Sequence, residues 1–568
     1  MRQLANTIPM RMNSQALAVQ APGRDLAANR PAPAARGRLL CRQLGWLVLL
    51  GLLGSVAGCA VGPDYARPAL PASRAYTPAS TEAALPAATA SAPVPGGAAQ
   101  RFVTAEVQAD WWRLFKSTAL NAVVARAFAA NPSIEAAQAA IGLAQENVAA
   151  QQGFFLPTVQ AGYAPTRSKI AGNLGGNSPG VQGDGSVIST SANTPASQGG
   201  TAPFNRPVIY NFHTAQLTVG YVPDLFGANQ RQVESLQAQA AYQRFQLQAT
   251  YLTLASNVVA AAIQEAMLRD QITSTQAVID SNLQALTLVQ RQKAAGYASR
   301  LDVALQDNAL AQARQALPGL EKQLDLTRDL LRALLGLPQD SDLPETFALA
   351  ALSLPEDLPL SLTSQLVEQR PDVRAAEAQL QMASAQVGVA LAARLPQFAI
   401  NAGAGGAAAN FGQMFWGSGR FFSLGLDVTQ QIFDGGTLLH RQRGAEQALR
   451  QAAAQYRSTA LTAFQNVADS LHAIEADARA LAAAAEVERT AAVALSLVRH
   501  QLARGYVDRL VLLGAERAWQ QAVMARSQAH ASRLGDTVAL FQALGGGWWG
   551  RDAAEPALAA DSMPGQAN

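Results

Sequence analysis

The feature that most constrains the fold is a pair of very long segments without a helix breaker. Neither proline nor glycine interrupts Ala228 to Ala295, and only Gly444 interrupts the segment from Leu438 to Arg504. As an α-helix of about 68 residues, each segment would be roughly 100 Å long, well beyond the diameter of a small globular domain. Apolar residues of the first segment recur at the alternating spacings of a coiled coil, namely Leu247, Tyr251, Leu254 and Val258. We therefore expect long helices that pack side by side.

The two long segments lie at equivalent places in an internal duplication. The sequence RQKAAGYASRLDVALQDNALAQ from Arg291 aligns without gaps with HQLARGYVDRLVLLGAERAWQQ from His500, at an offset of 209 residues. A second pair, beginning at Asn131 and Arg370, aligns at an offset of 239 residues. A fixed offset identifies a repeated unit, so the change in offset locates an insertion in the first repeat. The insertion falls at 167–207, whose Gly/Ser-rich sequence predicts a long surface loop without helix or strand.

Each half predicts the same order of elements. A first helix ends at a Leu-Pro breaker, and two strands, a long helix and a shorter helix follow, the last two separated by a Gly-Tyr break. The predicted short helices are Pro132 to Gln152 and Leu301 to Leu335 in the first half, and Pro371 to Ala393 and Leu510 to Leu544 in the second. Together, the two short helices of a half nearly equal the long one in length. We expect them to stack end to end along it.

The second predicted strand of each half alternates apolar and polar residues. The apolar positions are Ala215, Leu217, Val219, Tyr221, Phe422, Leu424, Leu426 and Val428. This is the apolar-out pattern of an outer-membrane β-barrel, although a half-buried soluble sheet shows the same alternation. Four strands cannot close a barrel, so we expect chains to share one, with eight strands from two chains or twelve from three.

The N-terminal region predicts export. The apolar run from Leu44 to Ala57 is too short to span a bilayer, which takes roughly twenty residues. It lies between arginines and small residues, in the order of a secretory signal. It ends in VAGC, which resembles the bacterial lipoprotein signal, so Cys59 is expected to become the acylated N-terminus; the alternative is an ordinary cysteine. By the same resemblance, Ala60 in place of Asp favours the outer membrane. From Arg67 to Gln100, a Pro-, Ala-, Ser- and Thr-rich sequence predicts an extended linker or a loosely packed arm.

Composition argues against several classes of protein. The 568 residues carry a formal net charge of +3 without a basic stripe, so nucleic acid is not an expected partner. The two cysteines, Cys41 and Cys59, leave no pair for a disulfide after the predicted cleavage. No run of about eighteen strongly apolar residues follows Cys59, which predicts no transmembrane helix in the mature chain. The five histidines form no metal motif, and we expect neither a metal site nor a cofactor.

The alternative class of protein is an enzyme, and one motif in the sequence resembles a catalytic motif. GNSPG at Gly176 fits the G-x-S-x-G pattern of a nucleophile. Ser178 lies in the low-complexity insertion, without the preceding strand and following helix that this motif requires. We therefore expect no catalysis there.

Several motifs together resemble a known family. They are CAVGPDYARP at Cys59, DWWRLFKSTALNAVVARAFAANP at Asp110, PDLFG at Pro223, FDGG at Phe433 and LGGGWW at Leu544. These are similar to motifs of the outer-membrane factor (TolC-like) family, in its NodT-type lipoprotein branch. The resemblance extends from Cys59 to about residue 549. This chain departs from the family motifs in two places. The motif PDLFG, which begins at Pro223, is not preceded by the tryptophan often found there, and the first repeat contains the Gly/Ser-rich insertion.

The resemblance implies a mixed α and β membrane protein. Three chains would share a twelve-stranded β-barrel in the outer membrane, four strands per chain, continuous with a long periplasmic α-helical barrel that is closed at its inner end. The implied function is the passive exit duct of a tripartite efflux pump. A periplasmic adaptor (membrane fusion) protein would join it to an inner-membrane transporter of the resistance-nodulation-division type. The alternatives are a structural coiled-coil envelope lipoprotein and the exit duct of a type I secretion system.

We predict five regions along the chain. They are a signal with an atypical N-terminal extension at 1–58, a lipidated cysteine and linker at 59–108, a first repeat at 109–340, a second repeat at 361–546 and a C-terminal tail at 547–568. A wide duct needs no specific pocket, so the sequence does not identify the cargo.

The two Gly-Tyr breaks are the predicted functional sites. The resemblance places adaptor contacts at these periplasmic tips, and the alternative is a plain interhelical turn. The predicted docking residues are Gly296, Tyr297, Arg300, Leu301, Gly505, Tyr506, Arg509 and Leu510. The gate candidates are Asp302, Asp508 and Arg504, since Asp-Arg pairs repeated around a threefold axis would hold a duct closed. The alternative is that these charges are simply solvated at exposed turns.

Overall fold

The computed structural model describes residues 60–69, 88–170, 179–181, 187–189, 208–360 and 369–548. The chain divides into two units, Met1–Gly58 and Cys59–Asn568, and all the described residues lie in the second. The predicted signal, the acylation site Cys59, the Ser178 motif and residues 549–568 of the predicted tail fall outside the described residues.

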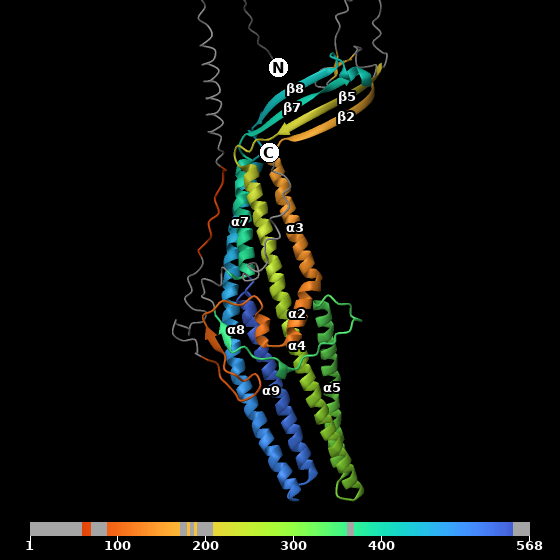
Figure 1. Cartoon of the computed structure of the whole chain (residues 1–568), viewed down its shortest axis with the longest axis vertical. Helices are drawn as coiled ribbons and strands as arrows, with labels where there is room; N and C mark the ends of the chain where they lie inside the picture. Colours follow the sequence, from red (N-terminus) through yellow and green to blue (C-terminus); the bar gives the residue numbers. More distant parts are fainter. Residues whose placement is uncertain are drawn as a thin grey trace, which may run out of the picture. The chain divides into compact units, whose positions relative to one another are not determined.

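The helices of the described residues form two sets, which match except that the first has one additional short helix (Figure 1). The first set is α2 (Thr118–Ala130), α3 (Pro132–Gln152), α4 (Ala228–Ala294) and α5 (Arg300–Leu334). The second set is α7 (Pro371–Ala392), α8 (Thr437–Ala503) and α9 (Arg509–Ala543). The predicted helix ends agree with these bounds to within one residue. α4 and α8 have 67 residues each, which makes each rod about 100 Å long.

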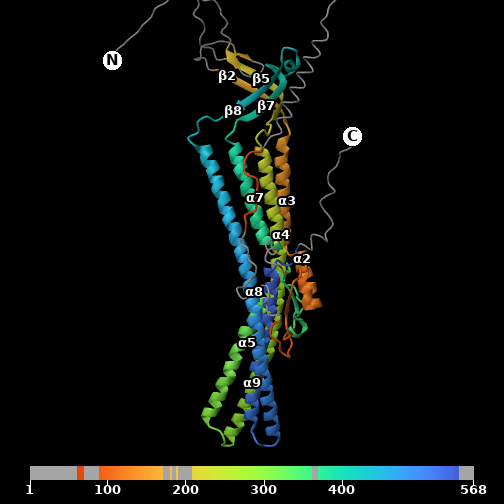
Figure 2. The same ribbon diagram turned by 90° about the vertical axis from the view of Figure 1, so that its left-hand side faces the viewer.

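Each long helix is lined by two short ones. α3 packs against the part of α4 nearer the sheet and α5 against the far part, and α7 and α9 pack along α8 in the same way (Figures 1 and 2). The predicted stacking of the short helices is confirmed. α4 also packs against α7 and α9, which joins the two repeats. Alanines such as Ala255, Ala262 and Ala266 are buried in α4, and their small side chains let the helices approach closely.

The four long strands form one antiparallel sheet in the order β2-β5-β7-β8. Their bounds are β2 Thr158–Ile170, β5 Val208–Tyr221, β7 Gln397–Ala408 and β8 Arg420–Thr429. The register aligns apolar residues across the sheet, because Ala161 pairs with Leu217, Leu217 with Ala404, and Ala404 with Phe422. On this face Phe422 and Leu424 are 85% and 77% exposed in the single chain. The predicted alternation thus produces one continuous apolar face.

The sheet is open at both edges. Among the described strands, β2 pairs only with β5, and β8 only with β7. The unpaired backbone groups of such edges are a template for pairing with another chain. A sheet shared between chains stays a prediction, because a single chain is described.

The insertion differs from its prediction in two ways. β2 continues through Arg167, which pairs with Asn211 of β5, and ends at Ile170, so the strand extends past the predicted start of the loop. Within the insertion, β3 (Pro179–Val181) pairs with β4 (Val187–Ser189), although we predicted no strand there. Backbone pairing does not require apolar alternation, so a Gly-rich sequence can form a short ladder that its side-chain pattern does not announce.

Residues 88–103 pack on the body of the chain, in contrast to the predicted extended linker. Gln100 is fully buried, and its side-chain amide donates to the Pro355 carbonyl and to Thr537 Oγ1 of α9, both at 3.1 Å. β1 (Arg101–Val103) pairs in parallel with β6 (Asp357–Pro359). Composition misled the prediction, because the partners of Gln100 come from segments far away in the sequence.

An aromatic core lies where η1 (Trp111–Phe115) meets α9. Trp111 stacks on Phe541 with ring centroids 5.2 Å apart, and Phe115 packs edge-on against Trp111 at 6.3 Å. Both η1 side chains are essentially inaccessible to solvent. Trp548, which we assigned to the C-terminal tail, packs on Phe245 of α4 at 5.8 Å. The other 3-10 turns in the described part of the chain are η2 (Gly153–Phe155), η4 (Leu349–Ala351) and η5 (Phe411–Phe415).

A fully buried arginine joins α9 to residues 88–100. The Arg533 guanidinium donates to Thr89 Oγ1 at 2.8 Å and to the Gly96 carbonyl at 3.0 Å. His530 lies directly beneath Gly96, where a Cβ would come within 2.0 Å of the imidazole ring. Burial, assisted by Arg526 and Arg533, lowers the pKa of His530 to about 4.

Among the described residues, one helix is apolar enough to cross a bilayer by length and composition. The window concerned covers 18 residues of α4, so the predicted absence of such a segment is too strict by this criterion. Of this window, 67% is buried within the chain. A buried core helix meets the same criterion, and α4 packs against α3, α5, α7 and α9.

Candidate functional site at the helix tips

The first tip is the turn between α4 and α5. The Tyr297 N–H donates to the Gln292 carbonyl at 2.8 Å, and the Gly296 N–H to the Lys293 carbonyl at 3.0 Å, which is a Schellman motif. Gly296 has a φ of 84°, a left-handed conformation that glycine adopts without the steric cost of a Cβ. The turn leaves Tyr297 87% exposed.

α5 begins with a capping box. Ser299 Oγ accepts from the Asp302 N–H at 3.1 Å, and the Asp302 carboxylate accepts from the Ser299 N–H at 2.7 Å. These hydrogen bonds to Ser299 lower the pKa of Asp302. A predicted gate residue therefore already serves as a helix cap.

The second tip has the backbone of the first but a different cap. Gly505 has a φ of 75°, and the Tyr506 N–H donates to the carbonyl five residues back at 2.9 Å. Asp508 is itself the N-cap of α9, since its Oδ1 accepts from the Val511 N–H at 3.0 Å. Val511 stands where the first tip has Asp302, so the carboxylate half of a capping box has no equivalent here.

The predicted docking residues lie together on these two turns. The exposed ones are Gly296, Tyr297, Arg300, Leu301, Gly505, Tyr506 and Arg509, and Leu510 is half-buried. Large apolar side chains exposed at the end of a helical hairpin offer a partner protein apolar surface to bury. Their contact with an adaptor stays a prediction.

The predicted Asp-Arg latch does not form within one chain. Among the described residues, neither Asp302 nor Asp508 makes an ion pair, and both bond to cap backbone instead. Arg509 Nη2 donates to Gln284 Oε1 of α4 at 3.2 Å, and Arg504 is exposed. Latching pairs between copies of the chain stay a prediction.

A buried asparagine above the tips escaped the sequence analysis. Asn282 of α4 is 2% exposed, and its Oδ1 accepts from Gln306 Nε2 of α5 at 3.1 Å and from Arg517 Nη1 of α9 at 3.0 Å. It thereby fastens both return helices to one turn of α4. No local sequence pattern marks it, because the three residues meet only once the helices have packed.

The residues that follow Cys59 lie in a groove between α4 and α7. The Val61 N–H donates to the Phe226 carbonyl at 3.1 Å, and the buried Arg231 guanidinium donates to Asp64 Oδ1 at 2.8 Å. Gly388 of α7 leaves room for the segment, since a Cβ there would lie 2.8 Å from the Val61 carbonyl oxygen.

Glu377 of α7 holds the end of the same segment. It accepts from Tyr65 Oη at 3.0 Å and from Arg67 Nη2 at 2.6 Å. Burial opposes ionisation of Glu377, but the Arg67 guanidinium outweighs it and lowers the pKa of this carboxyl. Burial and then Glu377 raise the pKa of Tyr65. These contacts hold residues 61–67 near the junction of helices and sheet.

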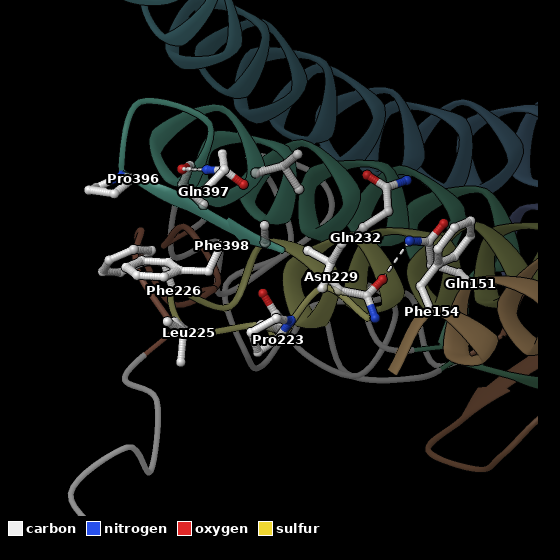
Figure 3. Close-up of a pocket in the computed structure, with 15 residues that line it drawn as sticks. Gln151, Phe154, Pro223, Leu225, Phe226, Asn229, Gln232, Pro396, Gln397 and Phe398 are labelled. Atoms are coloured by element: carbon white, nitrogen blue, oxygen red, sulfur yellow. Dashed lines mark hydrogen bonds between the residues drawn. The ribbon is translucent and has the colours of Figure 1, made fainter. Parts of the chain in front are cut away.

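A pocket of about 350 Å³ lies at that junction (Figure 3). Phe154, Phe226 and Phe398 supply much of its apolar wall, and Gln151 Nε2 of α3 donates to Asn229 Oδ1 of α4 across one end. Among the described residues that line it, there is no His, Cys, Ser or Lys side chain. Asp224 is the ionisable side chain among those residues. In the same described part of the chain, no three His, Cys, Asp or Glu residues gather as metal ligands would.

Comparison with known proteins gives, among others, the following four matches. The sequence model of the family described as outer membrane efflux protein matches residues 123–337 and 362–546. The pyoverdine export outer membrane protein OpmQ of Pseudomonas putida is 28% identical over 439 residues, covering 77% of this chain and 88% of that protein. The toluene efflux pump outer membrane protein TtgF of P. putida is 25% identical over 504 residues, covering 88% and 96%. The Campylobacter jejuni CmeC outer membrane channel has a similar structure, with a TM-score of 0.70 at 18% identity over 86% of this chain and 95% of that chain.

Proposed function

The chain belongs to the outer membrane efflux protein family, and we propose that three copies form the passive exit duct of a tripartite efflux pump in the outer membrane. An inner-membrane transporter of the resistance-nodulation-division type would deliver small molecules to it through a periplasmic adaptor. The names of two relatives concern pyoverdine and toluene. These cargoes are chemically unlike, so they support an export role without identifying the cargo of this chain.

The observation that carries the proposal is an open sheet with one apolar face. Side chains such as Phe422 and Leu424 are exposed in the single chain, and covering each with lipid would contribute about 1.5–3 kcal/mol. Unpaired edge groups cost several kcal/mol each in lipid, so β2 and β8 need partners there. Twelve strands from three copies would pair every edge and leave a pore, whereas eight would fill with side chains.

The N-terminal segment supports a lipid anchor at Cys59. Residues 60–67 are held in the groove of α4 and α7 by Arg231 and Glu377. This groove leads to the junction where the apolar sheet begins, which is the level at which acyl chains would enter the inner leaflet. Anchoring needs at least two membrane-binding signals, and multiple acyl chains together with the barrel would supply them.

The tips support adaptor docking and gating at the far end. Tyr297 and Tyr506 project from rigid Schellman turns, beside exposed arginines. Three copies would bring six such tips together around the axis. Asp302, Asp508 and Arg504 would then face neighbouring copies, where pairs absent within one chain would close the duct.

Two rival functions explain less of the molecule. An envelope spacer accounts for α4 and α8 but not for a sheet with one apolar and one polar face. One relative is named an efflux pump outer membrane protein and one structural neighbour an outer membrane channel, and we propose no catalytic role and no cofactor. A type I secretion duct would differ in its partners rather than in its fold.

Conductance in planar bilayers tests the duct. Purified mature protein should have the mass of a trimer in detergent and give discrete conductance steps, whereas a spacer should give none. Leu424→Lys should reduce insertion, because a lysine on the lipid face costs about 2–4 kcal/mol near the midplane. Ser423→Lys on the opposite face is the matched control and should still insert. A monomer without conductance, or equal insertion of both variants, would overturn the proposal.

A further inference from the structure

The outer end of the sheet carries basic residues for which the export role has no use. Arg167 and Lys169 lie near the end of β2, and Arg420 begins β8. All three are exposed. Within the described residues none of them forms an ion pair, and the Arg420 guanidinium donates only to the Phe415 carbonyl, at 3.1 Å.

The register puts these charges on the apolar face of the sheet. Residues at even spacing along a strand share a face. Arg167 follows Val159 by eight residues, and Arg420 precedes Val428 by eight residues. In a barrel strand tilted by about 40°, eight residues rise roughly 20 Å, which is close to the ~25 Å height of an apolar band. The basic residues of both edge strands therefore lie at the outer rim of that band.

Aromatic side chains mark the same rim. Tyr163 stacks on His213 with centroids 6.1 Å apart, and its hydroxyl lies 2.9 Å from His213 Nδ1. Phe411 packs edge-on against Tyr163 at 5.7 Å and against Phe415 at 5.6 Å. Phe411, Phe415 and the adjacent Trp416 are each more than half exposed. Exposed aromatic rings gather at the headgroup level of a membrane.

The arginine and lysine side chains of the four strands lie at one end of the sheet. Asp427, near the inner end of β8, lies on the opposite, polar face, where it accepts from Asn401 Nδ2. At the inner ends of the strands, Thr158, Gln397 and Thr429 are uncharged. An anionic lipid present in both leaflets would give no reason for this asymmetry. A phosphorylated lipid of the outer leaflet would, because it meets the sheet at the basic end alone.

We propose that Arg167, Lys169 and Arg420 bind the phosphate groups of the outer-leaflet glycolipid, lipid A. The inference rests on the proposed insertion of the sheet in the outer membrane. The forked donors of arginine suit a phosphate, and the lysine adds a point charge. In a trimer, β8 of one copy pairs with β2 of the next, so Arg420 and the Arg167–Lys169 pair of adjacent copies would share a headgroup.

Lipid binding by the full-length mature protein in detergent tests this surface. Native mass spectrometry would compare bisphosphorylated with dephosphorylated lipid A, for the wild type, for the double variant Arg167→Gln, Arg420→Gln, and for Arg443→Gln on the exposed face of α8. We expect the wild type and the α8 control to prefer the bisphosphorylated form. The double variant should bind it at least tenfold more weakly, because tenfold corresponds to the loss of one charge-assisted contact and the variant removes two arginines.

The same measurements distinguish failure of the proposed lipid site from failure of the proposed duct. Competition by inorganic phosphate at equal concentration would indicate a free-phosphate site and overturn the glycolipid assignment. Equal binding by the double variant and the wild type would overturn it as well. Conductance is recorded on the same samples: a conducting wild type without a lipid preference refutes only this surface, whereas a wild type that never conducts refutes the duct.

Discussion

The two return helices are equal in length and aligned by the duplication, yet their surroundings differ. Only Leu310 and Leu331 of the 35 residues of α5 are buried, whereas twelve residues of α9 are buried. α9 packs against both α4 and α8 and is held by residues 88–100, while α5 packs on α4. The duplication therefore specifies the hairpin but not its burial. The exposed face of α5 is the surface that a second copy would cover in the proposed trimer.

The two tips likewise share their backbone conformation but differ in their side-chain contacts. Both turns use a glycine with positive φ followed by an exposed tyrosine. The caps differ, with a reciprocal Ser299–Asp302 box in one and Asp508 alone in the other. The backbone of the turn is thus common to both repeats, and the position of the carboxylate is not.

The largest effect is expected at the glycine that the tips share. Gly296→Val or Gly505→Val forces a branched residue into a left-handed conformation, at a cost of about 1–3 kcal/mol, and redirects the following tyrosine. Efflux of a fluorescent substrate and cross-linking to the adaptor should fall to background while trimers still form. Gly319→Val in α5 is the control, because that glycine has no positive φ and open space around it. Loss at one tip only would assign docking to a single repeat, and full activity of both variants would leave the tips as plain turns.

Titration of a residue in α9 should change the free energy of unfolding by about 3 kcal/mol, and its counterpart position in α5 should make no such contribution. The folded pKa of His530 is lowered from 6.5 to about 4, so its neutral ring contributes stability above pH 6.5 that is lost as pH falls from 6.5 towards 4. His530→Gln should remove this loss in thermal melts of the detergent-solubilised protein. Glu321→Gln, at the exposed counterpart position of α5, should leave it unchanged.

The neighbouring carboxyl acts with the opposite sign. Burial and then Asp477 raise the pKa of Asp536 to about 6, so its contribution is present at low pH and is lost as pH rises through 6. The difference between the wild type and His530→Gln therefore isolates the histidine. A difference that does not change with pH would show that the imidazole titrates normally.

Removing the shared asparagine should loosen both hairpins together. Asn282→Ala leaves Gln306 and Arg517 without this acceptor, which should cost about 1–3 kcal/mol. Faster hydrogen exchange in the tip halves of both α5 and α9 is expected. Gln276→Ala, at an exposed position of α4, is the control. Faster exchange in one return helix only would mean that Asn282 does not couple them.

The smallest effect on stability is expected at the caps, and it separates capping from gating. Asp508→Ala should cost about 1 kcal/mol, whereas Asp508→Ser and Asp302→Gln keep the capping hydrogen bonds and remove the charge. If the charges close the duct, the two charge-removing variants should raise resting conductance and vancomycin sensitivity as Arg504→Ala does. Unchanged conductance and unchanged block by multivalent cations in the double Asp302→Gln, Asp508→Ser trimer would exclude the aspartates as the gate.

The sequence by itself determined the features that local chemistry controls. Helix ends follow from the Leu-Pro breaks and from Gly296 and Gly505, because those residues restrict or free the backbone wherever they occur. The apolar face of β5 and β8 follows from the period of two in a strand. The fixed offset of the two halves then placed both tips in the chain.

Tertiary structure decided the features that depend on distant partners. Gln100, Arg533 and Asn282 are polar residues that composition assigns to surfaces or linkers, yet each is buried because several segments meet around it. Asp302 and Asp508 were predicted as latches, and their hydrogen bonds show them to be caps within the chain. Burial and bonding of a polar side chain depend on what packs against it, and a periodic sequence carries no record of those neighbours.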